Sequence, residues 1–235
     1  MGEEFSIKES VDTYTEGITS EELSLRPVML QLVGDVRGNT VLDIGCGNGR
    51  YSQMFAQNGA NVIATDASTH QIELAKQKHS HQHIRYSVGD LSAESLPAAS
   101  ADVVFANLVI PSLGGTDKLD TLFEIARQAL KPGGKFVVSA LHPLLYVSSD
   151  ADMWDKATDF KPENYFTEGT QYHAEALTNA GNEMRFNESH FSLTRISEAM
   201  QKSGFVIRKI IESRQVPEKQ MLLPKYVAFE CVLAS

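Results

Sequence analysis

The chain has 235 residues, of which 42% are hydrophobic and 22% are charged, a composition typical of a globular domain that excludes a fibrous or wholly disordered protein. Its formal net charge of -9 argues against a surface that neutralises phosphates, so we expect no nucleic-acid partner. No apolar run reaches the roughly 18 residues that span a bilayer, and the N-terminus lacks the layout of a signal peptide. We therefore expect a cytoplasmic protein with no membrane partner.

The N-terminal segment predicts one or two helices before the first strand. Thr19 and Glu22 have the spacing of a capping box, and Pro27 suits the first turn of a helix. We assign residues 1–37 to an N-terminal helical cap.

The next hundred residues alternate between two kinds of pattern. Short runs rich in Val, Ile and Phe predict buried strands, and runs of helical spacing separate them. Such alternation implies βαβ units, hence a mostly parallel sheet with helices on both faces, which we assign to residues 38–141. The "KPGG" stretch at 131–134 predicts a helix stop followed by a turn. The predicted strands are 40–45, 61–66, 84–90, 101–107 and 135–141, and the predicted helices are 51–57, 68–78 and 116–130.

The last third of the chain is less regular. Residues 142–190 have no clear period and predict an inserted substrate-pocket or lid region, with aromatic side chains that either form an apolar lid or only seal the core. A helix ended by Gly204 and two closing strands, 205–212 and 226–234, then complete the core as residues 191–235. The fold class is therefore α/β, a doubly wound, seven-stranded, Rossmann-like sheet.

The two cysteines do not indicate a disulfide framework. Cys46 and Cys231 lie far apart, each within an apolar run, which favours buried thiols in a reduced compartment over a disulfide.

A glycine-rich turn follows the first predicted strand. Gly45, Gly47 and Gly49 let backbone N–H groups face a ligand at the carboxyl end of a parallel sheet. The dinucleotide fingerprint G-x-G-x-x-G requires glycine at position 50, where this chain has Arg50, so a nicotinamide enzyme is disfavoured.

Polar residues also end the following strands. Asp66, Asp90 and Asn107 close three consecutive strands, on the rim beside the glycine turn. Together they predict a nucleoside pocket, although each has an alternative role: Asp66 as a helix N-cap, Asp90 and Asn107 as turn formers.

Five motifs in order, "VLDIGCGNG", "TDAS", "GDLSAESLP", "ADVVFANLVI" and "LKPGGKFVVSALHP", resemble the motif series of the class I S-adenosylmethionine-dependent methyltransferases. The resemblance covers residues 38–141 and implies S-adenosyl-L-methionine as cofactor, S-adenosyl-L-homocysteine as product, and a last strand antiparallel to the sheet. It also implies roles: the glycine loop wraps methionine and ribose, Asp66 holds the ribose diol, Asp90 and the Leu91 backbone read adenine, and Asn107 lies near the methionine end. The implied cofactor-binding residues are Asp43, Gly45, Cys46, Gly47, Gly49, Asp66, Ala67, Asp90, Leu91 and Asn107.

The catalytic residue is less well defined. His142 directly follows the fifth strand on the cofactor rim, so it is either a base or acceptor orienter, or a histidine that fixes the loop before Pro143. We expect no metal, because His79, His81 and His83 read as a solvated loop without a completing ligand. The candidate substrate-binding residues are Tyr14, Tyr165, Tyr172 and His190.

The acceptor is expected to be a small molecule. The [DN]-P-P-[YF] motif of the methyltransferases that modify nucleic-acid amino groups is replaced here by "ANLVIPS", and a Pro-Cys nucleophile is absent. We predict methyl transfer to an O, N or C atom of a small-molecule substrate by in-line displacement, by a monomer or homodimer. The alternative is a non-catalytic or regulatory protein that binds S-adenosylmethionine or S-adenosylhomocysteine.

Overall fold

The computed structural model describes residues 20–89, 98–146, 155–157, 159–178, 180–216 and 223–234. Three of the predicted site residues, Tyr14, Asp90 and Leu91, lie outside this part of the chain.

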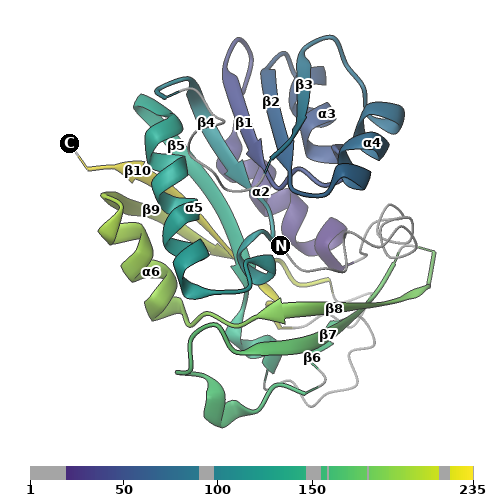
Figure 1. Ribbon diagram of the computed structural model, residues 1–235, viewed down its shortest axis with the longest axis vertical. Coiled ribbons are helices and arrows are strands. Elements are labelled where there is room, and N and C mark those ends of the chain that lie inside the picture. Colours follow the sequence, from purple (N-terminus) through teal and green to yellow (C-terminus); the bar gives the residue numbers. More distant parts are fainter. Residues whose placement is uncertain are drawn as a thin grey trace.

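A seven-stranded sheet with the order β3-β2-β1-β4-β5-β10-β9 forms the centre of the molecule (Figure 1). The first five strands pair in parallel, whereas β10 runs antiparallel to both of its neighbours, which confirms the predicted fold. The chain reverses its direction across the sheet between β1 and β4, and ligands of doubly wound sheets bind outside the carboxyl ends of the strands at such a switch point. The strands are β1 (Thr40–Ile44), β2 (Asn61–Asp66), β3 (Ile84–Val88), β4 (Ala101–Ala106), β5 (Leu130–Leu141), β9 (Phe205–Glu212) and β10 (Tyr226–Leu233).

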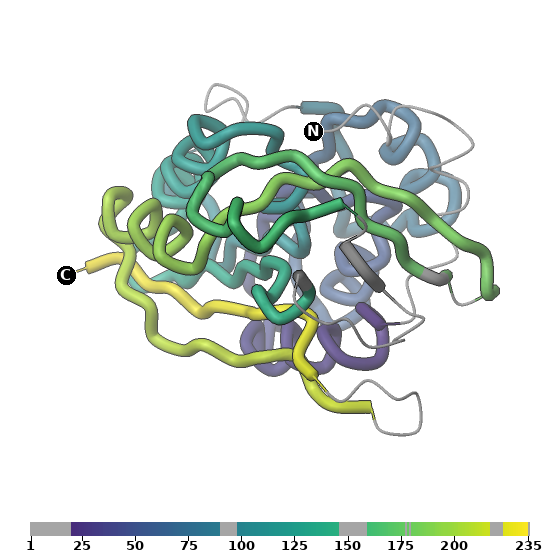
Figure 2. Tube along the Cα trace, turned by 90° about the horizontal axis from the view of Figure 1, so that it is seen from below, coloured from purple at the N-terminus to yellow at the C-terminus, as the bar shows by residue number. Residues whose placement is uncertain are grey.

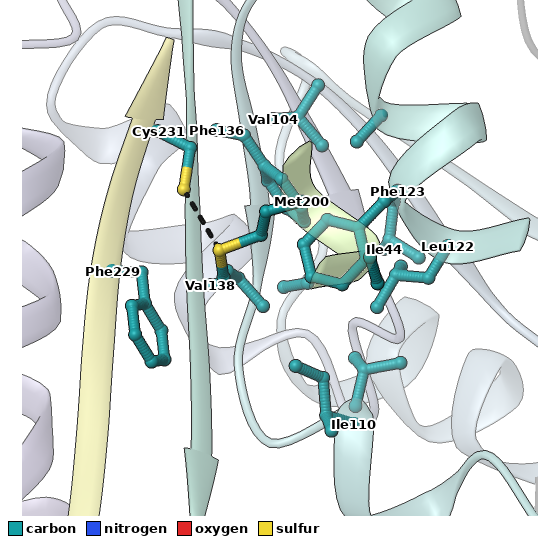
Figure 3. Close-up of a cluster of buried hydrophobic side chains, with 14 of the residues drawn as sticks. Ile44, Val104, Ile110, Leu122, Phe123, Phe136, Val138, Met200, Phe229 and Cys231 are labelled. Carbon is teal, nitrogen blue, oxygen red and sulfur yellow. Dashed lines mark hydrogen bonds between the residues drawn. The ribbon is translucent and has the colours of Figure 1, made fainter. Parts of the chain in front are cut away.

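Two apolar layers cover the sheet. One face packs against α5 (Thr116–Ala129) and α6 (Leu193–Lys202), where Phe123 and Met200 meet the sheet side chain Phe136 (Figure 3). The other face packs against α2 (Arg26–Val33), which continues the short π-helical segment η2 (Glu21–Leu25), and against α3 (Arg50–Gln57). The remaining helix of the parallel half is α4 (Thr69–Lys78).

The two cysteines are free thiols. Cys231 is fully buried, with its Sγ 3.7 Å from Sδ of Met200 (Figure 3), whereas Cys46 is half-buried in the glycine turn. The absence of a disulfide between them agrees with the prediction, but the burial of Cys46 is only partial.

The predicted turn at 131–134 is wrong as a separate element. Helix α5 passes directly into β5, because Leu130 is buried and pairs with Ala101, and the register shifts between Ala101 and Val103. Gly133 has a φ of +79° inside this irregular start, a conformation that glycine adopts without strain.

The inserted region contains a second sheet, whereas the sequence pattern predicts no regular element there. Its order is β6 (Asp155–Ala157), β7 (Gln171–Leu177) and β8 (Glu183–Ser189), all antiparallel. Burial alternates along both longer strands, which is the period of a half-buried strand. The buried members are Tyr172, Ala174, Ala176, Met184 and Phe186.

This small sheet lies across the end of the molecule toward which β5 runs (Figure 1), and the β7–β8 pair crosses that end when it is seen from below (Figure 2). Gly114, in the loop after β4, donates its N–H to Oγ of Ser189 at the end of β8, at 3.1 Å. The insertion therefore packs against the loop that follows the central strand β4.

Candidate active site

The glycine turn between β1 and α3 is held in a conformation that requires glycine. Gly45, Gly47 and Gly49 have φ values of +67°, +52° and +83°. A Cβ on Gly45 would lie 2.6 Å from Cγ2 of Val109, so the turn closes against the loop after β4 with no room for a side chain.

Asp66, at the carboxyl end of β2, faces this turn. Its two carboxylate oxygens accept hydrogen bonds from the N–H groups of Gly47 and Ser68, each at 2.9 Å. Burial, with only 5% of the residue exposed, raises the pKa of the carboxyl group. The N-cap of α4 is Ser68, which accepts from the Gln71 N–H, so the alternative role of Asp66 as N-cap is wrong. Ala67 lies between Asp66 and Ser68 in the chain.

Asp43 lies under the glycine turn at the end of β1. It is buried and accepts a hydrogen bond from Oγ of Ser52 at 2.5 Å. Burial raises the pKa of its carboxyl group to about 7, the Ser52 hydroxyl opposes that rise, and the negative charge of Asp66 adds to it.

Asn107 fixes the corner after β4. Its Oδ1 accepts from Oγ of Ser139 at 2.9 Å, and its Nδ2 donates to Oε1 of Glu21 at 3.3 Å. The next residue, Leu108, has a φ of +53°, an unusual conformation for a non-glycine residue that clusters at functional sites. Asn107 thus forms the turn and also reaches the N-terminal cap.

A cavity opens between the glycine turn, the end of β4 and the N-terminal cap. Seven of its lining residues are not among the predicted site residues: Glu21, Arg26, Asn48, Arg50, Tyr51, Met54 and Phe105. In the sequence, Arg50 stands out only as a departure from the dinucleotide fingerprint, and the cap helix only by its capping spacing. The lining residues are Glu21, Arg26, Asp43, Gly45, Cys46, Gly47, Asn48, Arg50, Tyr51, Met54, Phe105 and Asn107.

His142 is held away from this cavity and is not among its lining residues. Its Nδ1 accepts from the Leu144 N–H at 3.1 Å, and its Nε2 lies 2.9 Å from Oε1 of Glu212. The backbone N–H of His142 donates to the Lys225 carbonyl. These contacts tie the loop after β5 to the β9 and β10 side of the sheet.

Three of the four predicted substrate residues meet in the insertion. The Phe160 ring lies 4.8 Å from the His190 ring and 5.4 Å from the Tyr172 ring, and Tyr165 lies 5.0 Å from His190. Burial lowers the pKa of His190, and its Nε2 lies 2.7 Å from the Tyr165 carbonyl oxygen, so that nitrogen carries the proton and donates. These contacts define one aromatic cluster.

The residues around the glycine turn fit S-adenosylmethionine. The turn leaves no space for side chains at Gly45, Asp66 presents oxygens that can accept from hydroxyls, and charged groups line the cavity. Across the described residues, no group of three or more His, Cys, Asp or Glu side chains is placed to hold a metal ion. The helices of that same part include none with the length and apolar character required to cross a bilayer.

Known proteins resemble this chain in sequence. A family described as "Methyltransferase domain" matches residues 42–138. Malonyl-[acyl-carrier protein] O-methyltransferase of Yersinia pestis is 30% identical over 67% of this chain and 59% of its own length. The Serratia marcescens protein of the same name is 34% identical over 44% of this chain and 39% of its own length. The chain thus spans about half the length of these curated relatives.

Solved structures share the fold. The CcbJ methyltransferase from Streptomyces caelestis superimposes with a TM-score of 0.69 at 17% identity, covering 99% of this chain and 98% of that one. An S-adenosylmethionine dependent methyltransferase from Mesorhizobium loti gives a TM-score of 0.64 at 21% identity, over 87% of this chain and 95% of that one. The matched domain, the strand order and these neighbours agree: residues 42–138 match a methyltransferase domain, and the chain has the fold of the class I S-adenosylmethionine-dependent methyltransferases, whose cofactor is S-adenosylmethionine.

Proposed function

We propose that this protein is an active methyltransferase that methylates an O, N or C atom of a small-molecule acceptor. The observation that carries the proposal is the position of the Asp66 carboxylate. Hydrogen bonds from the backbone N–H groups of Gly47 and Ser68 hold it beside the glycine turn, at the switch point of the sheet. In this proposal Asp66 holds the ribose diol, the glycine turn wraps the methionine and ribose, and Asn107 lies near the methionine end.

An oxygen acceptor is the preferred version of this proposal. Two kinds of relative, malonyl-[acyl-carrier protein] O-methyltransferases and a ubiquinone biosynthesis O-methyltransferase that is 36% identical over 45% of this chain, carry that reaction in their names. The acidic net charge of -9 further supports a small acceptor over nucleic acid.

The main contribution of the protein to the reaction is to position the acceptor against the methyl group of the cofactor. The bound cofactor supplies a methyl group on a sulfonium, which is already an activated electrophile. The protein then aligns the acceptor and excludes water, and alignment can lower the barrier by several kcal/mol, up to roughly 7–11 kcal/mol. The insertion, which packs on the loop after β4, is the element that we propose to hold the acceptor, through the aromatic cluster of Tyr165, Tyr172 and His190.

His142 serves this proposal as a residue that positions the loop after β5. Both of its ring nitrogens already have partners, Leu144 N–H and Glu212. We therefore expect His142→Gln to lower the turnover number less than about tenfold, well short of the roughly 10²–10⁴-fold loss of a general base. A larger loss with an unchanged melting temperature would identify His142 as the base.

The direct test is methyl transfer from radiolabelled S-adenosylmethionine to a panel of small carboxylic acids, phenols and amines. We expect labelled product with a subset of the oxygen acceptors, and less product from Tyr165→Ala than from the exposed control Phe166→Ala. Tight binding of S-adenosylhomocysteine without transfer to any acceptor of the panel would instead favour a non-catalytic binding protein.

A further inference from the structure

Four charged side chains, two of each sign, lie on the cap side of the cavity beside the glycine turn, and their ion-pair contacts are uneven. Glu22, in η2, forms ion pairs with Arg26, at 2.9 Å, and with Arg50. Two guanidinium groups therefore share one carboxylate. Both arginines line the cavity, so the positive charge that remains adjoins it.

The opposite surplus lies at Glu21. Its Oε1 accepts from the Tyr51 hydroxyl at 2.5 Å and from Nδ2 of Asn107 at 3.3 Å, and both donors are neutral. No cationic side chain of the described residues forms an ion pair with Glu21. Burial raises the pKa of this carboxyl group, as expected for a carboxylate that lacks a cationic partner in contact.

A ligand that satisfies both surpluses must carry one ammonium and one carboxylate group. The cofactor of this family ends in an α-amino acid, which is such a zwitterion at neutral pH. We propose that Glu21 binds the ammonium group and that Arg26 and Arg50 bind the carboxylate of the methionine end, so that the N-terminal cap forms part of the cofactor site.

Two features separate this proposal from a purely structural ion-pair cluster. A structural cluster is stabilised by pairing each buried charge, because an unpaired buried charge costs free energy. Here Arg26 and Arg50 both contact Glu22 and act on Glu21 only through space, because Glu21 has no ion-pair contact among the described residues, and Glu21 and both arginines lie on the wall of a cavity that the glycine turn also lines. In addition, Asn107 ties Glu21 to the end of β4, which fixes the carboxylate relative to the sheet.

The test compares two ligands that differ only at the amino-acid end, and it rests on the family's cofactor. S-adenosylhomocysteine carries the zwitterion, whereas 5′-methylthioadenosine keeps the nucleoside and thioether without it. Calorimetry measures the affinity of each ligand for wild type, for Glu21→Gln, for Arg26→Gln and for the exposed control Glu183→Gln. Glu21→Gln keeps an acceptor for Tyr51 and Asn107, so the cap should stay folded, and thermal unfolding checks this.

We expect Glu21→Gln and Arg26→Gln to lower the affinity for S-adenosylhomocysteine at least about tenfold, which corresponds to roughly 1.4 kcal/mol of binding free energy. The affinity of both variants for 5′-methylthioadenosine should stay within about twofold of wild type. The control variant should bind both ligands with the affinity of wild type. Decarboxylated S-adenosylmethionine separates the two halves, because Arg26→Gln should no longer lower its affinity whereas Glu21→Gln still should.

Equal losses for both nucleosides, or no loss for either, would overturn the zwitterion site while leaving the cofactor assignment intact. Failure of wild type to bind S-adenosylhomocysteine at all would overturn the cofactor assignment and this inference with it.

Discussion

At the residue scale, a buried carboxyl group beneath the glycine turn has a pKa far from its value in water. The Asp43 carboxyl group is buried beneath the turn, and this burial raises its pKa from the ordinary value of 3.8 to about 7. The folded protein therefore keeps a proton there that the unfolded chain has already released at mildly acidic pH. Such a group stabilises the fold most below its unfolded pKa, and the contribution is lost as pH rises through its folded pKa.

Asp43→Asn should remove this pH dependence. As the pH rises from about 4 to 7, the free energy of unfolding of wild type should fall by up to about 4 kcal/mol more than that of the variant. One pKa unit corresponds to about 1.4 kcal/mol. Urea unfolding at several pH values measures the difference, with Glu183→Gln as an exposed control. Parallel profiles for wild type and Asp43→Asn would contradict the prediction.

Gly45→Ala tests the close contact between the turn and the loop after β4. An alanine there meets Val109 and also adopts a φ of +67°. Gly38, with a φ of +77° and nothing within 4 Å of its would-be Cβ, provides a control that carries the backbone cost alone. We expect Gly45→Ala to lose stability by about 1–3 kcal/mol more than Gly38→Ala, from overpacking, and to lose S-adenosylhomocysteine binding. Equal losses in chemical unfolding would show that the contact is unimportant.

Sequence motifs predicted the residues of the turn because their geometry is local. The position of Asp66 follows from the end of β2, and the structure adds that Gly47 and Ser68 orient it. Glu21 and Arg26 were not predicted, because their approach to Asn107 and the turn depends on how the cap packs against the sheet, across 86 residues in the case of Glu21. No local pattern encodes that contact.

At the element scale, the sheet and its two helical layers determine where the rim lies. Phe123 of α5 packs edge-on against Phe136 of β5 with ring centroids 5.7 Å apart, and both rings are fully buried. Phe166 in the insertion is 81% exposed. The two phenylalanines form a matched pair for separating core packing from surface contact.

Phe123→Ala should destabilise the protein by about 3–5 kcal/mol, because truncation of a buried ring loses its transfer free energy and leaves a cavity. Phe166→Ala should cost less than about 1 kcal/mol, as substitutions on the surface do. Chemical unfolding with the same denaturant measures both. Comparable losses for the two variants would mean that α5 is not anchored as described.

The elements of the core were predicted with bounds close to those observed, since buried parallel strands and amphipathic helices differ clearly in period. The β7–β8 pair was missed although Tyr172, Ala174 and Ala176 alternate with exposed residues. Alanine is a weak signal for a strand, and charged residues between the apolar ones obscured the period. The "KPGG" turn was misassigned because Leu130 pairs with Ala101 across the sheet, a contact that outweighs the local preference of Pro and Gly.

At the scale of the whole molecule, the strand order, the glycine turn and the insertion all converge on the carboxyl edge of β1 and β4. The cap supplies Glu21 and Arg26 to the cavity, the core supplies the turn and Asp66, and the insertion packs on the loop after β4. Because these three segments, distant in sequence, converge there, we propose that edge as the cofactor site.

The central claim is that Asp66 and the glycine turn bind the nucleoside part of the cofactor, and calorimetric titration of S-adenosylhomocysteine into wild type and Asp66→Ala tests it most directly. Asp35→Ala, which removes an exposed carboxylate, is the control. We predict micromolar binding by wild type and by the control, and a loss of about 1–3 kcal/mol in Asp66→Ala, the value of a hydrogen bond to a charged group. No binding by wild type, or equal binding by a folded Asp66→Ala, would contradict the account.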